Sequence, residues 1–261
     1  MAFDGRLVLY RVTGPLAPNW VPPTFDVVLP GTSHLCWVMP GNIDGQSRTF
    51  SLPTVDSLSY RSLIGTDRKD MARLVDAFLT GLTQIRSLPI DGDRVEPTPL
   101  QRLRQWWTTD ALGEPEAKLR ERVVELLTLD DFDRIQRLFE SKHNTSVLGS
   151  ASCSELFPAD NSSNVHVLID EVCAGPSDWE IGVLLGEQIE ILAHIAPTVP
   201  PTEDPVVITL LKNSTTSWNH LGLIAGLRWL LHLHDYLTYV RYSESILEQA
   251  TYACSLITNQ D

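Results

Sequence analysis

Residues 221–240 read LGLIAGLRWLLHLHDYLTYV, the most apolar long stretch of this 261-residue chain. A membrane-spanning helix here would place Arg228, His232 and Asp235 near the middle of a bilayer. A charged side chain at that depth costs roughly 2.5–3.5 kcal/mol, which outweighs the gain from the surrounding leucines. The stretch therefore predicts a core helix of a water-soluble fold, extending over about residues 217–241.

Other elements of the second half are predicted around this helix. Residues 177–180, Ser-Asp-Trp-Glu, match a capping box and so begin a helix. Ser243 is the expected cap of a last helix that ends near Ile257. Residues 196–205 contain four prolines, which predict a stiff extended segment. Residues 206–211, which are apolar and partly β-branched, predict a buried strand.

The middle of the chain predicts amphipathic helices. From Met71 to Ile85, apolar side chains recur at i, i+3, i+4 and i+7. Charges of both signs lie between them, which is typical of helices at the surface. Helices are expected at 66–86, 98–107, 115–129 and 131–142, the last with Asp130 as its cap.

The first fifty residues predict a β-meander. The pairs Pro30-Gly31 and Pro40-Gly41 supply turn chemistry, because proline fixes φ and glycine tolerates a positive φ. A further strand, apolar on both faces, is predicted at 165–172. The expected strands of the meander are 6–12, 25–29, 35–39 and 49–52.

Together these elements predict an α+β fold, with a small, mostly antiparallel N-terminal sheet and a helix-rich remainder. The length allows one large domain, so we expect a single domain over residues 1–261. Any internal boundary falls in residues 143–163, which are rich in Ser and Asn and predict a polar loop. Cys153 lies there among small residues, and the simplest interpretation is a flexible loop without a nucleophile.

Charge is unevenly divided along the chain. Residues 143–261 carry three basic and fourteen acidic side chains, a net of −11, whereas residues 1–142 carry a net of −2. A block of negative charge repels nucleic acid and anionic lipid, and it attracts a basic partner. We therefore expect a non-enzymatic interaction protein, either a subunit of an assembly or a self-associating structural protein. Its partner would be a protein with a basic surface or another copy of the chain, with no nucleic-acid binding and no stable membrane insertion.

The sequence contains none of the common cofactor or metal motifs. It has no G-x-G-x-x-G and no G-x-x-x-x-G-K-[ST] to hold nucleotide phosphates. Its four cysteines form no C-x-x-C pair for zinc. We therefore expect neither a cofactor nor a metal. The N-terminus lacks a secretory signal pattern, and free thiols suit a reducing compartment, so a cytoplasmic location is expected.

One set of polar residues on the apolar helix supports an enzyme as the alternative hypothesis. Arg228, His232 and Asp235 stand at i, i+4 and i+7, in one narrow stripe. Asp235 would orient His232, and Arg228 would hold a carboxylate or phosphate, as in a hydrolase or transferase. The simpler interpretation is a buried helix with three compatible groups along its polar edge. Enzymes seldom take a whole acid–base set from one helix, so an enzyme is not expected.

A pair of tryptophans predicts a protein interface. Trp106 and Trp107 lie close to Arg102 and Arg104. Neighbouring side chains on a helix face about 100° apart, so one ring can enter the core while the other stays exposed. An exposed Trp beside Arg is typical of interface hot spots. The equal alternative is that both rings pack in the core.

The aromatic content of residues 218–242 supports a third hypothesis, a protein that acts on membranes under some conditions. Trp and Tyr side chains suit the membrane–water interface. The acidic flank of this helix opposes binding to anionic lipid.

Overall fold

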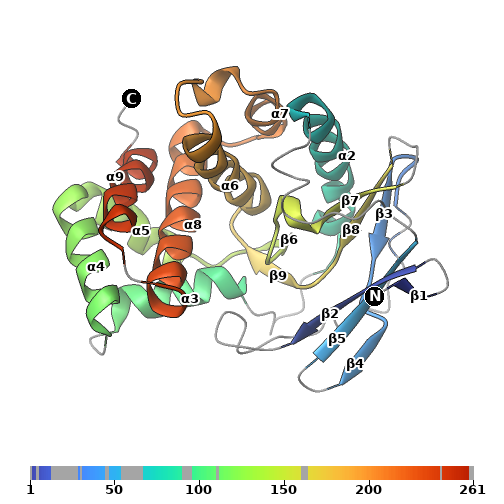
Figure 1. The fold of residues 1–261 in the computed structure, drawn as a ribbon, viewed down its shortest axis with the longest axis horizontal. Helices are drawn as coiled ribbons and strands as arrows, with labels where there is room; N and C mark the ends of the chain where they lie inside the picture. Colours follow the sequence, from blue (N-terminus) through green and yellow to red (C-terminus); the bar gives the residue numbers. More distant parts are fainter. Residues whose placement is uncertain are drawn as a thin grey trace.

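The computed structural model describes residues 2–3, 6–12, 29, 31–44, 47–53, 67–89, 96–109, 112–159, 164–241 and 243–258. Within these residues, short strands gather on one side of the molecule and helices form the other (Figure 1). The α+β prediction is confirmed: small N-terminal sheets are followed by a helix-rich region.

The N-terminal sheet is antiparallel, with the strand order β1-β2-β5-β4. Its two long strands, β2 and β5, pair along seven residues each. The strands predicted at 6–12 and 49–52 are confirmed, and the second is longer than expected. Of the strand predicted at 25–29, only Leu29 lies within the described residues, and it is outside any strand. The bounds are β1 (Ala2–Phe3), β2 (Arg6–Val12), β4 (Asn42–Asp44) and β5 (Ser47–Pro53).

The strand predicted at 35–39 is present as β3 (Leu35–Val38), but it does not join the meander. It pairs in parallel with β8 (Val165–Leu168), and β7 (Leu156–Pro158) pairs antiparallel with the other edge of β8. The meander prediction is therefore wrong for this strand. Three of its four residues are buried, so it has apolar side chains on both faces, as strands of parallel pairs do.

The loop predicted over 143–163 is wrong for most of its described part. This segment contains β6 (Thr145–Leu148), the 3-10 turn η1 (Cys153–Glu155) and β7. Strand β6 pairs with β9 (Val172–Gly175), so the single strand predicted at 165–172 is two strands. Cys153 is 1% exposed, and the expectation of a flexible loop around it is wrong.

Helices make up most of the remaining described residues. The helix expected over 217–241 is confirmed as α8, and most of its apolar side chains are buried. None of the helices in the described part of the chain combines the length and apolar character that crossing a bilayer requires. The helices are α2 (Arg68–Arg86), α3 (Thr98–Thr108), α4 (Glu114–Leu126), α5 (Leu129–Glu140), α6 (Trp179–Ile195), α7 (Pro205–Asn213), α8 (Trp218–Tyr239) and α9 (Glu244–Thr258), with a 3-10 turn η2 (Pro201–Glu203) before α7.

Residues 206–211, predicted as a strand, form most of α7 instead. The Asp204 carboxylate accepts hydrogen bonds from the N–H groups of Val206 (2.9 Å) and Val207 (3.1 Å). Pro205 occupies the first helical position, where its missing N–H would have no partner in any case. This cap and this proline outweigh the β-propensity of the valines.

Two predicted helix starts also need correction. Helix α6 follows Asp178, which has a left-handed φ of 57°. Glu180 closes no capping box, because its carboxylate accepts a hydrogen bond from the N–H of Leu148 at 2.8 Å. Helix α5 is capped by Thr128, whose side chain accepts from the N–H of Asp131, and not by Asp130.

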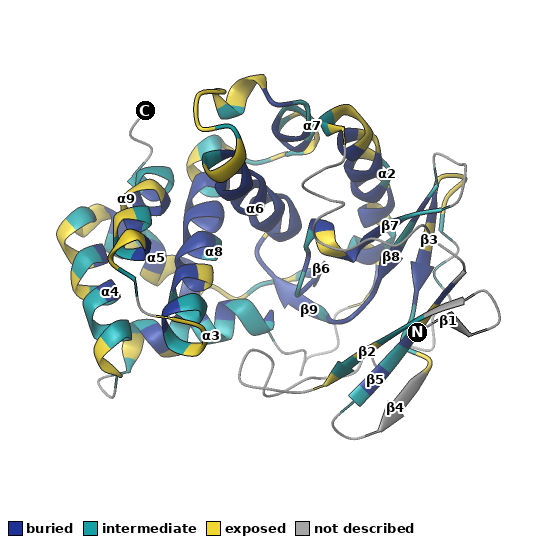
Figure 2. Cartoon of the chain, in the orientation of Figure 1, coloured by how far each residue is buried: buried dark blue, intermediate teal, exposed yellow. Residues whose placement is uncertain are grey.

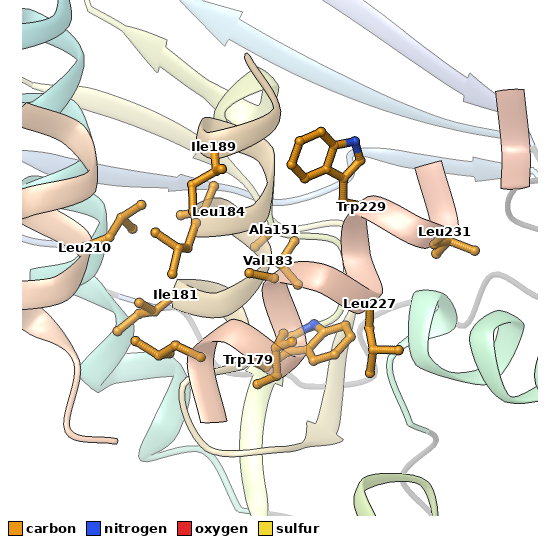
Figure 3. Packing of buried hydrophobic residues seen from close by; sticks show 14 of the residues in the cluster. Ala151, Trp179, Ile181, Val183, Leu184, Ile189, Leu210, Leu227, Trp229 and Leu231 are labelled. Atoms are coloured by element: carbon orange, nitrogen blue, oxygen red, sulfur yellow. The ribbon is translucent and has the colours of Figure 1, made fainter. Parts of the chain in front are cut away.

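Helices α6 and α8 form the centre of the core. Helix α6 is buried along most of its length (Figure 2). Gly186 brings it into backbone contact with α8, since a Cβ there would lie 3.0 Å from the Cα of Ala225. Trp179 of α6 and Trp229 of α8, each 1% exposed, contribute two large rings to this packing (Figure 3).

A second, smaller core holds the N-terminal sheet against the sheet of β3, β8 and β7. Phe50 and Leu52 of β5 contribute to it from one side. The contact between the two sheets is therefore apolar at Phe50 and Leu52. It becomes charged at Arg48, which precedes Phe50 on the same face of β5. The members of this core are Val38, Phe50, Leu52, Phe157 and Leu168, with Leu9 packed against them.

Candidate active site

Two arginines extend the inward face of the N-terminal sheet. Arg48, Phe50 and Leu52 alternate along β5, so Arg48 lies on the face that carries the small core. Arg11 on β2 is directly opposite Arg48 in the antiparallel register. Like charges at directly opposed positions destabilise a sheet, so this pair needs nearby anions.

Two carboxylates from later in the chain supply those anions. Arg11 forms ion pairs with Glu155 and Asp170, and Arg48 forms one with Asp170. Glu155 ends η1, and Asp170 lies just beyond the end of β8. Arg48, Glu155 and Asp170 are 4%, 7% and 6% exposed. The Arg11 side chain is 30% exposed. The four groups, which we call the junction cluster, therefore neutralise one another, three of them away from water.

Burial and charge set the protonation states in the junction cluster. Burial raises the pKa of Glu155 above its ordinary value, and the Arg11 guanidinium offsets only part of this rise. Burial also acts to lower the pKa of Arg11, but the carboxylates of Glu155 and Asp170 outweigh it, and the net shift is upward. Arg11 therefore stays charged in this site.

The segment after β6 connects the junction cluster to α6. Glu187 accepts hydrogen bonds from the Ser152 hydroxyl (2.6 Å) and from the N–H of Cys153 (2.8 Å). Gln188 donates to the Cys153 Sγ at 3.2 Å. Burial, together with the Glu187 carboxylate, raises the pKa of the Cys153 thiol well above its ordinary value. The thiol stays protonated and is therefore a poor nucleophile.

A small cavity lies at the junction. Ser150, Ser152, Glu155, Asp170 and Glu171 contribute to its lining. Its volume is about 10 Å³, enough for about one water molecule.

The sequence analysis missed the junction cluster, although one signal was present. Asp170 and Glu171 follow directly on the buried strand β8. Ligand sites in sheets with parallel strands lie beyond the carboxyl ends of those strands. Arg11 and Arg48 carry no comparable signal, because only the register of β2 against β5 places them opposite each other.

The predicted stripe on α8 is divided in the structure. Arg228 forms an ion pair with Glu190 of α6. The Nδ1 atom of His232 lies 2.5 Å from Oε1 of the same Glu190. Asp235 instead pairs with Arg102 of α3. The residue that orients His232 is therefore Glu190, and Asp235 belongs to a different contact.

Glu190, Arg228 and His232 lie next to the segment after β6. The Nη2 atom of Arg228 is 4.0 Å from Glu187, the carboxylate that also holds Ser152. Burial acts to raise the pKa of Glu190, but the hydrogen bond from His232 and the charge of Arg228 outweigh it and lower the pKa overall. Glu190 is therefore ionised, while the His232 side chain is 50% exposed and can reach a bound molecule.

The residues predicted to form an interface on α3 make contacts within the chain. Trp106 is 2% exposed, and its ring centroid lies 5.8 Å from that of Trp107, which is partly buried against the core. Arg102 pairs with Asp235, and Arg104 donates to the carbonyl of Phe139. An interface of these four residues with another molecule stays a prediction.

Most of the negative charge in the second half is internal. Of its fourteen acidic residues, the structure describes twelve, and eight of these are buried. Among the described residues, five arginines of the first half pair with carboxylates of the second half, so much of the expected basic partner is the same chain. Beside the junction cluster, the pairs are Arg68–Asp204, Arg86–Asp178 and Arg102–Asp235.

Comparison with known proteins identifies the fold. No protein-family model and no curated protein matches the sequence. The choline kinase LicA from Streptococcus pneumoniae is similar in structure, with a TM-score of 0.51 at 9% identity over 85% of this chain and 74% of that chain. An ethanolamine kinase from Plasmodium vivax has a TM-score of 0.49 at 10% identity, over 97% of this chain and 74% of that one. A choline/ethanolamine kinase family protein from Mesorhizobium loti has a TM-score of 0.49 at 10% identity, over 85% and 73%.

These findings overturn the prediction of a non-enzymatic interaction protein and the expectation that the chain is not an enzyme. The fold is that of the choline kinase LicA. The charge asymmetry that carried the prediction is largely neutralised inside the chain.

Proposed function

We propose that this protein is a phosphotransferase that moves a phosphoryl group from a nucleoside triphosphate to the hydroxyl group of a small molecule. The observation that carries the proposal is the opposed pair Arg11 and Arg48, which faces Asp170 and Glu155 at the junction. The similarity in fold to a choline kinase supports it.

The junction cluster has the charges that phosphoryl transfer needs. Catalysis of this reaction consists mostly of positioning and of stabilising charge on the transferred group. Arginine side chains bind phosphate oxygens through two parallel hydrogen bonds. When a triphosphate enters, Arg11 and Arg48 exchange carboxylate partners for phosphate oxygens, so no buried guanidinium is left without an anion.

The same exchange frees Asp170 and Glu155 to hold a magnesium ion. Mg²⁺ prefers oxygen ligands and usually takes one or two carboxylates plus the phosphates of the substrate. The described residues contain no group of three or more metal-binding side chains, but this mode of binding needs only two. The ion would neutralise negative charge on the phosphate oxygens.

We place the acceptor beside Glu190, Arg228 and His232. Because Glu190 holds Nδ1 of His232, Nε2 is the ring nitrogen that can take a proton from an acceptor hydroxyl. Arg228 lies near Ser152, which lines the junction cavity, through their common neighbour Glu187. A small alcohol, such as the choline that LicA is named for, is the acceptor class we propose.

Nucleotide binding tests the donor half of the proposal. The wild-type protein should bind ATP in a magnesium-dependent way in isothermal titration calorimetry. Arg11→Ala and Arg48→Ala should each weaken that binding about ten-fold or more, since each removes charge-assisted hydrogen bonds. Asp170→Asn should abolish the magnesium dependence.

Arg73→Ala is the matched control, because Arg73 pairs with Asp70 on the exposed surface of α2. It should leave ATP affinity unchanged. Circular dichroism of each variant would show whether its fold is intact. An intact wild-type protein that binds no ATP at millimolar Mg²⁺ would contradict the proposal.

Replacing His232 tests the proposed site for the acceptor alcohol. His232→Asn should lower the rate of ADP release with a panel of small alcohols about 100-fold, because a general base contributes about that much or more. ATP affinity should be unchanged. His34→Asn, at an exposed position, is the control and should behave as the wild type. If His232→Asn lowers only the melting temperature, the residue has a structural role.

A cytoplasmic location remains part of the proposal. All four cysteines are free thiols, and thiols persist in reducing compartments. Binding of a basic protein or of a second copy of the chain stays a prediction.

A further inference from the structure

A second cavity, far larger than the one at the junction, lies between α6, α8, α9 and residues 196–202. We call it the α9 pocket. Its volume is about 610 Å³, within the range of about 300–1,000 Å³ that is typical of small-molecule sites. It therefore has room for a drug-sized ligand without any movement of the chain.

The α9 pocket is separate from the proposed active site. Ile189 and Ala193 of α6 line the pocket, whereas Glu187 of the same helix faces Ser152 and Cys153. At 3.6 residues per turn, Ile189 points about 200° away from Glu187. The pocket therefore lies on the face of α6 opposite the contacts of Glu187, and no residue of the acceptor site is in its lining.

Aromatic rings form one wall of the pocket. Trp229 of α8 and Tyr252 of α9 are stacked, with ring centroids 6.2 Å apart and an interplanar angle of 9°. Trp229 is buried, while Tyr252 is 60% exposed. Trp218, at the start of α8, adds a third ring to the lining. Such a wall favours a flat apolar group.

The charge of the lining favours a cation. Glu248 of α9 is the only Asp, Glu, Lys or Arg among the described residues that line the pocket. It lies one helical turn before Tyr252, at the spacing i, i+4 that places both on one face. An aromatic face also attracts cations and repels anions. Both features disfavour an anionic metabolite such as a nucleotide.

We propose that the α9 pocket binds a small amphipathic amine, whose flat apolar group packs against the rings of Trp218 and Tyr252 and whose ammonium group faces Glu248. This site is independent of the phosphotransferase proposal, because none of its residues belongs to the junction cluster or to the acceptor site.

Three probes with the same phenyl group and different charge test the inference. They are 2-phenylethylamine, 2-phenylethanol and 3-phenylpropanoate, measured at pH 7 by ligand-observed NMR titration without nucleotide. The amine should bind saturably and about three-fold or more tightly than the alcohol, and the carboxylate should bind most weakly. Glu248→Gln should reduce the affinity for the amine to that of the alcohol, and Tyr252→Ala should weaken binding of both.

Matched controls come from the same part of the surface. Glu244→Gln changes an exposed acid of α9 that is outside the pocket lining, and Tyr239→Ala removes an exposed ring that is also outside it. Neither should change the affinity for the amine. Arg48→Ala should also bind the amine with wild-type affinity, whether or not the substitution weakens ATP binding. Absence of saturable binding of the amine, or equal binding by Glu248→Gln and the wild type, would overturn the inference.

Discussion

Replacing Asp178 by asparagine is expected to lower the free energy of unfolding by about 1.5–3 kcal/mol, the range for hydrogen bonds to a charged group. The Asp178 side chain is 2% exposed. Its carboxylate accepts from the N–H groups of Thr215 (2.9 Å) and Thr216 (3.1 Å) and from Arg86 (3.0 Å). Asparagine tolerates the left-handed backbone of this position, so the loss of stability measures the contribution of the carboxylate and not of the backbone conformation.

The loss of stability caused by Asp178→Asn should become smaller as the pH falls. Burial acts to raise the pKa of Asp178, but the hydrogen bonds from Thr215 and Ser214 and the charge of Arg86 lower it below its ordinary value of 3.8. A lowered pKa in the folded state stabilises the protein above the unfolded pKa and ceases to do so as the pH falls. The difference in the free energy of unfolding between the wild type and Asp178→Asn, measured by urea unfolding, should therefore become smaller below about pH 4.

Asp70→Asn is the control for this experiment, because Asp70 pairs with Arg73 at the exposed surface of α2. Its effect should stay within about 0.5 kcal/mol. A loss below about 1 kcal/mol for Asp178→Asn would show that the carboxylate does not organise residues 214–216.

Glu180 should make the protein less stable as the pH rises from 5 to 8. This side chain is 0% exposed, and its Oε2 atom has no hydrogen-bond partner within the described residues. Burial raises its pKa from 4.5 to about 7. A raised pKa in the folded state stabilises the protein below the unfolded pKa, and this contribution is lost as the pH rises through about 7. The loss amounts to roughly 3 kcal/mol.

Glu180→Gln should remove most of this pH dependence, as measured by urea unfolding at intervals between pH 4.5 and 8. The pKa of Glu171 is also raised by burial, while burial lowers the pKa values of His143 and His166. These other groups titrate in both proteins, so the difference between the two curves isolates Glu180. Glu203→Gln, at an exposed position, should reproduce the wild-type curve. Parallel curves for the wild type and Glu180→Gln would mean that Glu180 does not titrate in this range.

Local signals in the sequence predict the helices and much of the sheet. The periodicity from Met71 to Ile85 corresponds to α2, and the apolar residues 221–240 correspond to most of α8. Residues 206–211 show how one local signal overrides another. The cap Asp204 and the first-turn Pro205 were both visible in the sequence, and they identify α7 as a helix despite its valines.

Pairing between distant strands could not be predicted, and the active site depends on it. Strand β3 has the composition of a meander strand, yet its partner is β8, more than a hundred residues away. Arg11 and Arg48 look like surface charges of an exposed sheet until the register of β2 and β5 is known. The sequence shows the excess of carboxylates in the second half, but it does not show that the arginines which neutralise them come from the first half.

The hydrogen-bond partner of His232 also could not be predicted from the sequence, because it comes from a neighbouring helix. The i, i+3 and i+4 spacings on α8 suggested Asp235 as its partner, because both residues lie on one helix. The actual partner, Glu190, comes from α6. Gly186 and Ala225 bring these two helices into backbone contact, and this close packing places Glu190 within reach of His232.

The opposed arginines also make the stability of the N-terminal sheet depend on residues far along the chain. The repulsion between Arg11 and Arg48 weakens the pairing of β2 with β5. The carboxylates that relieve this repulsion lie 144 and 159 residues after Arg11, and such distant contacts form slowly. The pairing of β2 with β5 therefore gains its full stability only when Glu155 and Asp170 are in place beside the two arginines.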